Sequence, residues 1–357
     1  MEYVKTLGGF HVKRRYIVLG AILLVVLCAW IWVSQNKMKL MARQVDKAVA
    51  SMVAAQQISD TRFEVIFCGT GTPQYNPDRS QPCLGVIAGG RLFLFDAGQG
   101  ASQQLQATKS PYQKLDTVFL THLHSDHMSG LGDVLHNGWL TGRQDLVEVV
   151  GPPGTQRLLE GIQLSFKDDI EERQRVIGSE YLNTGTALGR ANEVTIDNDQ
   201  AEVVFEDNGV VIQAFGVDHP DWPHAYGYKV EFGGKSIVIS GDTKYTPAIG
   251  QHAQGVDYLI HEVINTDFME MAAQALQKHG TGIAPERMAL ITAAHTPTLE
   301  VAKAAVDANA KALVLTHHIP PIPANKFVES IYTKGMDEIY DGDIIMARDG
   351  MRLTLIE

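Results

Sequence analysis

The stretch THLHSDHMSG, residues 121–130, directly follows the apolar run TVFL and holds three histidines and one aspartate within six positions. TVFL has the β-branched and aromatic residues that are typical of a buried strand. Alternate side chains of an extended segment share a face, so His122, His124 and Asp126 can point the same way, with His127 brought in by the turn. Imidazoles and a carboxylate at this spacing predict a metal site, which suits Zn²⁺, with Mn²⁺ and Fe²⁺ left open.

Four other apolar runs also end in residues that bind metals. The runs are RLFLF before Asp96, SIVISG before Asp242, YLI before His261 and Glu262, and ALVLT before His317 and His318. From residue 61 onward such runs alternate with glycine-rich turns and helical stretches, which indicates one α/β domain. The ligand crevice of such a sheet lies beyond the carboxyl ends of the strands, so we expect these side chains to converge on one site.

Charge is distributed unevenly along the 357 residues, which are enough to bury a full core. Residues 1–60 carry eight Lys or Arg and three Asp or Glu, whereas the remainder carries 22 basic and 38 acidic residues, a balance of −16. A field of this sign repels polyanions, which argues against tight binding of nucleic acid. Of the three cysteines, Cys28 lies in an apolar segment, and Cys68 and Cys83 are expected to be small buried thiols; a single bridge between these two is the alternative.

The N-terminal segment YIVLGAILLVVLCAWIWV, residues 16–33, contains no charged residue and is just long enough to cross the hydrocarbon core of a membrane. Trp30 and Trp32 at its far end suit the membrane interface, and the basic residues 13–15 before it favour the cytoplasmic side. A cleavable signal peptide is the alternative, although no small-residue cleavage site follows the apolar run. We therefore predict a short basic cytoplasmic N-terminus at 1–15, a single-pass transmembrane anchor at 16–33, a linker at 34–60, and a hydrolase domain at 61–357 on the periplasmic or extracytoplasmic side.

The motif HxHxDH, followed in order by VDHPDWPH at 217–224, SGDT at 240–243 and LTHH at 315–318, resembles the metallo-β-lactamase superfamily. FCGTGTPQ at 67–74, FDAGQG at 95–100 and GPPGT at 151–155 resemble its ribonuclease Z-like branch, which includes arylsulfatase-type and phosphodiesterase-type members. The resemblance covers essentially all of residues 61–357. It implies an α/β fold, the four-layer αβ/βα sandwich, in which helices cover two packed mixed sheets.

Carried over position by position, the resemblance implies two metal ions, which we expect to be zinc. The first ion would be bound by His122, His124 and His219, the second by Asp126, His127 and His317, and Asp242 would bridge them. Asp96 would hold a ligand histidine in its orientation from outside the ligand set.

The branch also has a histidine and a glutamate that assist protonation of the leaving group. His295 in AAHTPT and Glu262 in IHEV occupy the matching places, and Asp126 is assigned to catalysis as well as to the metal. Thr296 can cap a following helix and Pro297 suits its first position, so we expect His295 to stand at a helix N-terminus.

Two such metal ions lower the pKa of a bridging water, and the resulting hydroxide acts as the nucleophile. We predict a membrane-anchored hydrolase that cleaves a small phosphodiester, a sulfate ester or a related ester. His318, Trp222 and Tyr226 are predicted to line its substrate pocket. The predicted partners are a small-molecule ester and the membrane, and self-association is left open.

Two other functions stay open. Cleavage at the 3′ end of tRNA, an activity of this branch, relies on a long basic arm, whereas residues 160–207 here hold twelve Asp or Glu and four basic residues. Because phosphate contacts dominate RNA affinity, this acidic interval argues against nucleic acid as a partner. The second alternative is a non-catalytic binding protein on the same fold.

Overall fold

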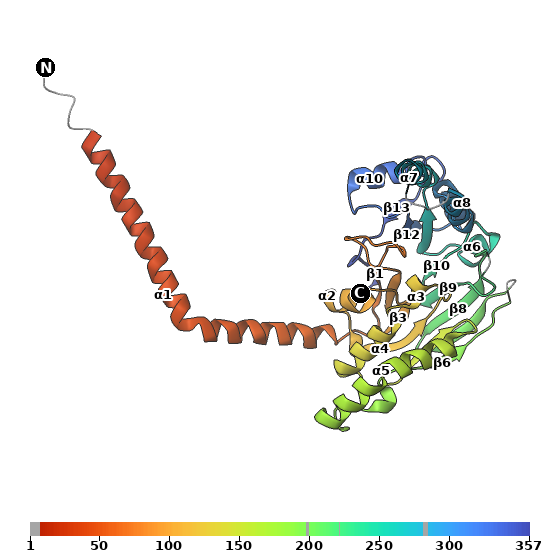
Figure 1. The fold of residues 1–357 in the computed structure, drawn as a ribbon, viewed down its shortest axis with the longest axis horizontal. Helices are drawn as coiled ribbons and strands as arrows, with labels where there is room; N and C mark the ends of the chain where they lie inside the picture. The colour runs from red at the N-terminus through yellow and green to blue at the C-terminus, as the bar shows by residue number, and fades with distance from the viewer. Residues whose placement is uncertain (1–7, 198–199, 221, 281–284) are drawn as a thin grey trace, which may run out of the picture. The chain divides into compact units, whose positions relative to one another are not determined.

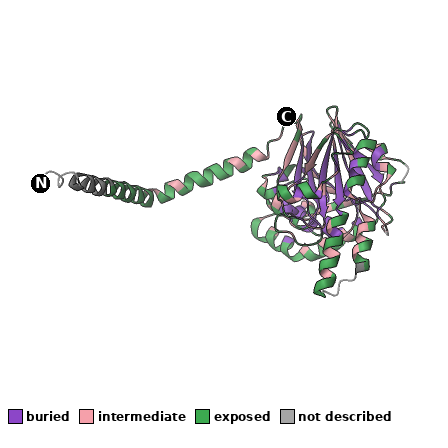
Figure 2. Cartoon of the chain, turned by 90° about the horizontal axis from the view of Figure 1, so that it is seen from above, coloured by how far each residue is buried: buried purple, intermediate pink, exposed green. Residues whose placement is uncertain are grey.

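The computed structural model describes residues 8–197, 200–220, 222–280 and 285–357. The chain divides into two units, of which the smaller ends at Ala55 and the larger spans Gln56–Glu357. In the smaller unit, Gly8–Ala55 form one helix, α1, whose described side chains are almost all exposed (Figure 2). Its segment Ala21–Ala55 is long and apolar enough to cross a membrane, a property that a signal sequence would share. The helix also continues through the predicted linker as far as Ala55.

The larger unit contains two seven-stranded sheets (Figure 1). The first has the order β14-β1-β2-β3-β4-β5-β6, with β1 at Phe63–Gly69, β2 at Cys83–Ala88, β3 at Arg91–Phe95, β4 at Leu115–Phe119, β5 at Val147–Gly151, β6 at Gly189–Glu193 and β14 at Arg352–Ile356. The second has the order β13-β12-β11-β10-β9-β8-β7, with β7 at Glu202–Asp207, β8 at Val210–Gly216, β9 at Tyr226–Phe232, β10 at Lys235–Ile239, β11 at Tyr258–Ile264, β12 at Ala312–Ile319 and β13 at Asp343–Met346. Both sheets are mixed, since β3 to β6 and β10 to β13 pair in parallel and the other pairs are antiparallel.

Helices cover the outer face of each sheet. The helices of the larger unit are α2 at Ala101–Ala107, α3 at Ser125–Met128, α4 at Leu131–Leu140, α5 at Thr155–Ile177, α6 at Pro247–His252, α7 at Thr266–His279, α8 at Pro285–Ala294, α9 at Thr298–Asp307 and α10 at Lys326–Tyr332. Apolar side chains of α2, α4 and α5 pack on the first sheet, and those of α6, α9 and α10 pack on the second. Short 3-10 turns lie at Tyr112–Lys114 and Thr184–Thr186.

The main core lies between the two sheets. Along β3, Phe93 and Phe95 face the opposite sheet, whereas Leu92 and Leu94 face the helices, as the period of two in a strand requires. The Phe95 ring stacks on Phe119 of β4 with the ring centroids 5.1 Å apart. These four layers confirm the predicted αβ/βα sandwich.

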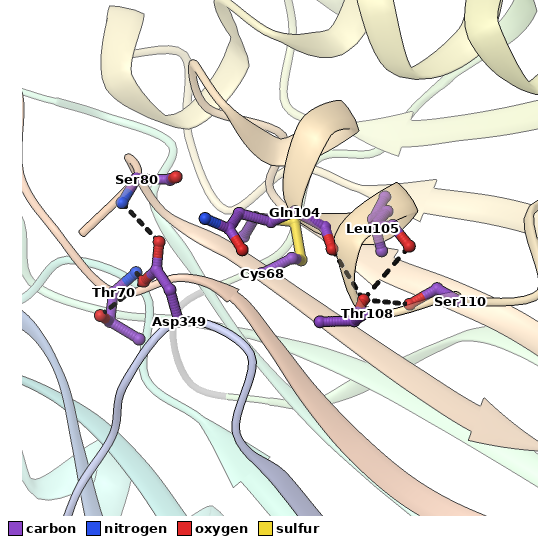
Figure 3. The surroundings of a disulfide bond; sticks show 9 residues. Cys68, Thr70, Ser80, Gln104, Leu105, Thr108, Ser110 and Asp349 are labelled. Carbon is purple, nitrogen blue, oxygen red and sulfur yellow. Dashed lines mark hydrogen bonds between the residues drawn. A yellow bond between two sulfur atoms is a disulfide. The ribbon is translucent and has the colours of Figure 1, made fainter. Parts of the chain in front are cut away.

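A disulfide joins Cys68 at the end of β1 to Cys83 at the start of β2 (Figure 3). The expectation of two free thiols was therefore wrong, and the alternative of a single bridge holds. The antiparallel pairing of β1 with β2 shifts register between Phe67 and Gly69, which brings the two cysteine Cα atoms to 4.9 Å from each other. That separation lies within the range that a disulfide can span.

Removing this bridge should destabilise the larger unit. Replacing Cys68 and Cys83 together with alanine frees a loop whose ends are 15 residues apart, and we expect the free energy of unfolding to fall by about 3 kcal/mol. Urea denaturation of the full chain, followed by tryptophan fluorescence, measures this change. Cys28→Ala is the matched control, because Cys28 is a free cysteine of α1 and its loss should leave the midpoint unchanged. Equal midpoints for the double variant and the control would contradict the expectation.

Candidate metal centre

The strand ends bring the seven predicted ligands together at one edge of the two sheets. Two follow β4, two lie on α3, one each follows β8 and β10, and one lies near the end of β12; in chain order they are His122, His124, Asp126, His127, His219, Asp242 and His317. Their nitrogen and oxygen atoms form groups whose members all lie within 4.8 Å of one another. Six of the seven side chains are buried, and His124 is partly exposed.

The first group consists of His122, His124, His219 and Asp242. His124 Nδ1 lies 2.9 Å from His122 Nε2 and 3.2 Å from His219 Nε2, and Asp242 Oδ2 lies 3.9 Å from His122 Nε2. Two nitrogens bound to one tetrahedral zinc ion would lie roughly 3.4 Å apart. The four atoms are therefore spaced as the ligands of a single divalent ion.

The second group consists of Asp126, His127 and His317. Asp126 Oδ2 lies 3.5 Å from His127 Nε2 and 3.3 Å from His317 Nε2. Asp242 Oδ2 approaches the same two nitrogens, at 3.2 Å from His127 and 3.5 Å from His317. One oxygen of Asp242 thus lies beside the ligand atoms of both groups.

The charges of the cluster also suit a cation. The buried His127 Nε2 makes no hydrogen bond within the described part of the chain. Burial favours the neutral imidazole, but the carboxylates of Asp242, Asp96 and Asp126 raise the pKa of His127 well above its usual value. The three carboxylates around the His127 imidazole favour a positive charge beside them. Either a proton on the ring or a bound divalent cation can supply that charge. By contrast, burial lowers the pKa of His122 well below its ordinary value and keeps that ring neutral, as a metal ligand must be.

Asp96 fixes the orientation of His127. Its Oδ2 accepts a hydrogen bond from His127 Nδ1 at 2.7 Å, which leaves Nε2 of that ring directed at the cluster. Its two oxygens also accept from the backbone N and the hydroxyl of Thr121, each at 2.8 Å. Asp96 and His317 both adopt positive φ, 60° and 47°, a strained conformation that a fold retains where the surroundings enforce it.

His295 and Glu262 form a pair at the rim of the cluster. Glu262 lies within β11, and its Oε2 is 3.3 Å from His295 Nδ1. Burial opposes the charged imidazole, but the Glu262 carboxylate raises the pKa of His295 to about 9. His295 therefore carries a proton at neutral pH, and its ring lies with its centroid 5.6 Å from that of His317.

The helix after His295 begins one residue later than predicted. Helix α9 begins at Thr298 with Pro297 as its N-cap. Thr296 does not cap the helix, because its hydroxyl donates to the Thr243 carbonyl and its backbone N donates to Glu262 Oε1 at 2.8 Å. Thr296 instead holds Glu262 in place beside His295.

Only one of the three residues predicted to line the substrate pocket lies at the cluster. The half-buried Trp222 ring is 4.5 Å from the His124 ring and 6.0 Å from the His122 ring, centroid to centroid. Tyr226 lies instead in the core between the sheets, where its hydroxyl donates to the Val194 carbonyl. His318 is fully buried and donates from Nδ1 to the Thr70 carbonyl, so it faces the loop after β1.

Two residues that support the site were missed at the level of sequence. Thr121 links Asp96 to the motif, and its hydroxyl lies 3.0 Å from His122 Nδ1. The Ala294 carbonyl lies 3.4 Å from His219 Nδ1 and accepts its hydrogen bond. Thr121 directly precedes the first histidine of the motif, and this position could have indicated that it supports the site. Nothing in the sequence indicates the contact of Ala294, since it depends on how α8 packs.

Known proteins similar to this chain include ribonucleases and other metallo-β-lactamase fold proteins. Ribonuclease Z of Mycobacterium marinum is 34% identical over 267 residues, which are 74% of this chain and 89% of that protein. The crystal structure of the short form of human tRNase Z matches with a TM-score of 0.55 and 22% identity over 81% of this chain and 98% of that one. The metallo-β-lactamase fold protein YhfI of Bacillus subtilis matches with a TM-score of 0.55 and 19% identity over 82% and 99%.

These relatives overturn two predictions. The sequence predicted a hydrolase of a small phosphodiester or sulfate ester and argued against nucleic acid as a partner. The relatives that are about one-third identical over most of both chains bear the name of a ribonuclease, which favours the endonuclease alternative instead. The exclusion of nucleic acid was therefore wrong.

The error came from using the net charge of residues 160–207 to exclude a class of ligand. At least five of the twelve acidic side chains there have a hydrogen-bond or ion-pair partner within the larger unit. Asp169 contacts His136 and Arg173, and Glu172 pairs with Arg175. Glu193 accepts from the backbone N of Gly154 and of Gln156, Asp207 pairs with Arg91, and Glu160 accepts from the Gln156 side chain. The interval forms α5, β6 and β7, and the pairs within α5 leave its net charge unchanged. Net charge acts at long range and does not by itself exclude a nucleic acid as a partner.

The fold, the ligand groups and the sequence agree on one family. A model described as the beta-lactamase superfamily domain matches residues 91–318, which include all seven clustered ligands. Together with the ribonuclease Z relatives, the His and Asp clusters support a metal-dependent hydrolase that binds divalent metal. The chain belongs to the metallo-β-lactamase superfamily.

Proposed function

We propose that the chain is an endonuclease of the ribonuclease Z type, which hydrolyses a phosphodiester bond at the 3′ end of precursor tRNA. The observation that carries this proposal is the 34% identity to ribonuclease Z over 89% of that protein's length. The buried His and Asp cluster supports it, because phosphodiester hydrolysis needs a cation beside the phosphate and a source of nucleophile.

The cluster would hold two zinc ions. His122, His124 and His219 would bind the first, and Asp126, His127 and His317 the second, with Asp242 shared between them. When bound, the ions would lower the pKa of a water to give the nucleophile and would neutralise the phosphate. Asp96 would keep His127 in the tautomer that leaves Nε2 free for the metal.

His295 would supply the proton that the leaving oxygen of the ribose requires. Glu262 raises its pKa to about 9, so the imidazole is a charged donor at neutral pH. Thr296 donates to the other oxygen of Glu262 and so keeps Oε2 directed at His295. Trp222, whose ring lies beside His124, would contact the nucleotide next to the scissile phosphate.

A second proposal concerns location. We infer that α1 anchors the chain in a membrane, with residues 1–15, 16–33, 34–60 and 61–357 as N-terminus, anchor, linker and hydrolase domain, and with the larger unit outside the cytoplasm. Precursor tRNA is confined to the cytoplasm, so this placement and the precursor-tRNA substrate exclude each other, and the topology decides between them. The apolar segment of α1 supports the anchor, and the Cys68–Cys83 disulfide supports an oxidising compartment. A reporter that is active on only one side of the membrane, fused after Glu357, tests the topology; activity on the cytoplasmic side overturns it. This test does not depend on the substrate.

Cleavage of a precursor tRNA transcript with a 3′ extension tests the main proposal. The purified, zinc-loaded chain should produce one cut at the junction of the acceptor end and the extension, and a chelator should abolish it. Denaturing electrophoresis of end-labelled transcript locates the cut. An intact transcript after incubation with fully metallated protein would overturn the proposal and favour a binding protein on the same fold.

A further inference from the structure

The disulfide closes a loop that borders the metal centre. The segment GTGTPQYNPDRSQP, residues 69–82 and here called the 69–82 loop, lies entirely between Cys68 and Cys83. Cys83 lines a small cavity of about 40 Å³ together with His127, Asp242 and His317. At the end of the loop, Gln81 Oε1 accepts hydrogen bonds from the Ser129 hydroxyl, just after α3, and from the backbone N of Gln99.

Glycines let the 69–82 loop lie directly against the ligand helix α3. A Cβ on Gly98 would come within 2.0 Å of the Asp126 carbonyl oxygen and 2.6 Å of Gln81 Cβ. A Cβ on Gly100 would come within 2.7 Å of the Ser80 hydroxyl. The FDAGQG motif therefore provides the close contact between the loop and the helix that carries two of the ligands.

The loop is held firmly from inside. Arg79 is buried and donates to the Thr70 hydroxyl at 2.8 Å and the Ala347 carbonyl at 2.6 Å, and it pairs with Glu329. The Asp349 carboxylate accepts from the backbone N atoms of Thr70 and Ser80, which lie on either side of it (Figure 3). With the disulfide at its base, the loop is a rigid wall beside the metal centre.

One large side chain of this rigid loop is left in solvent. Tyr75 is 89% exposed and borders a pocket of about 280 Å³. Gln99 and Gln104 line the same pocket, and their side-chain amides have no hydrogen-bond partner among the residues described. The charged residues of the lining are both engaged elsewhere, since Arg79 is paired internally and Asp78 accepts from the backbone N of Ala324. The pocket thus offers one aromatic face and the amides of Gln99 and Gln104, and the exposed charge in its lining, Asp78, is negative and does not suit a phosphate.

We propose that this pocket binds an unpaired nucleobase of the RNA substrate, which stacks on Tyr75 and pairs its edge with the amides of Gln99 and Gln104. The inference rests on the proposed ribonuclease function and adds a binding site for the substrate to it. Stacking on an aromatic ring and hydrogen bonding of base edges are how proteins recognise unpaired RNA, and neither needs a positive charge. The disulfide and Arg79 already fix the loop, so it loses little conformational entropy when the base binds.

The test is steady-state cleavage of the precursor transcript by the zinc-loaded full chain. Tyr75→Ala should raise KM about tenfold to a hundredfold with kcat nearly unchanged, because stacking contributes to binding and not to the chemical step. Tyr75→Phe keeps the ring, so its KM should rise much less than that of Tyr75→Ala. Tyr181→Ala is the matched control, since Tyr181 is also an exposed tyrosine, 64% accessible, that lies after α5 and does not line the pocket.

Transcripts with a single abasic nucleotide, placed in turn on either side of the cleavage site, identify the bound base. For the unaltered chain, one position should raise KM as much as Tyr75→Ala does, and the two changes together should cost no more than either alone. If Tyr75→Ala matches Tyr181→Ala while the unaltered chain cleaves the transcript, the pocket proposal is overturned and the ribonuclease function stands. If the unaltered chain does not cleave, both proposals fall.

Discussion

Asp242→Ala should remove bound zinc and lower the rate of phosphodiester cleavage by at least about a thousandfold. A single oxygen of Asp242 lies 3.2 Å from His127 Nε2 and 3.5 Å from His317 Nε2, and it is also the acidic member of the group with His122. Its loss therefore removes a negative charge from both ligand groups at once. Metal ions supply several kcal/mol of transition-state stabilisation in such sites, which corresponds to this loss of rate.

Elemental analysis after gel filtration and single-turnover cleavage measure the two effects together. Asp207→Ala is a suitable control, because Asp207 is an exposed carboxylate at the end of β7 that pairs with Arg91. The control should keep the zinc content and rate of the unaltered chain. Circular dichroism shows whether Asp242→Ala remains folded. A folded Asp242→Ala protein with full zinc content and an unchanged rate would refute the shared role of this carboxylate.

The clustering of six of the seven proposed ligands could be predicted from local sequence, whereas His219 was assigned from the family resemblance alone. The motif histidines follow an apolar strand directly, and the segments around Asp242 and His317 repeat the same arrangement of strand and ligand. Parallel strands bring their carboxyl ends to one edge, so convergence follows from the fold class alone. Asp96 was identifiable for the same reason, since it is the first residue after β3.

The pocket residues could not be predicted in this way, because a shift of a few positions along the chain changes whether a side chain points to the site or into the core. Trp222 and Tyr226 are four residues apart near His219, but Tyr226 begins β9 and points between the sheets, whereas Trp222 lies in the preceding loop. Similarly, the spacing of Cys68 and Cys83 does not reveal the register shift of β1 against β2 that brings them together. Both outcomes depend on tertiary pairing that no local pattern encodes.

The prediction of the substrate failed for an electrostatic reason. The net charge of residues 160–207 already includes Arg173 and Arg175, the partners of Asp169 and Glu172, so these pairs do not reduce it. Both pairs lie within α5 at i,i+4 and i,i+3 spacing, so the sequence alone already indicates them. Net charge predicts long-range attraction or repulsion but not which ligand a buried site accepts.

His295→Ala should lower the rate of cleavage by about a hundredfold to ten-thousandfold while the zinc content stays unchanged. The ring lies at the rim of the cluster and is paired with Glu262 Oε2 at 3.3 Å, an arrangement that favours the charged imidazole. Its removal takes away the proton for the leaving oxygen but leaves the seven proposed ligands in place. A loss of kcat with little change in KM is therefore expected, because the proton is needed only in the transition state.

Glu262→Gln separates the role of the proton from that of the ring. The pKa of His295 is raised to about 9 by the Glu262 carboxylate, so the charged donor is present below that pH and is lost as the pH rises through it. Glutamine keeps the shape and removes the charge, which lowers the pKa of His295 and should move the alkaline fall of kcat to lower pH. His295→Ala should abolish this alkaline limb, since no donor remains to titrate. If the alkaline limb has the same midpoint in the unaltered chain, Glu262→Gln and His295→Ala, the imidazole does not deliver the proton.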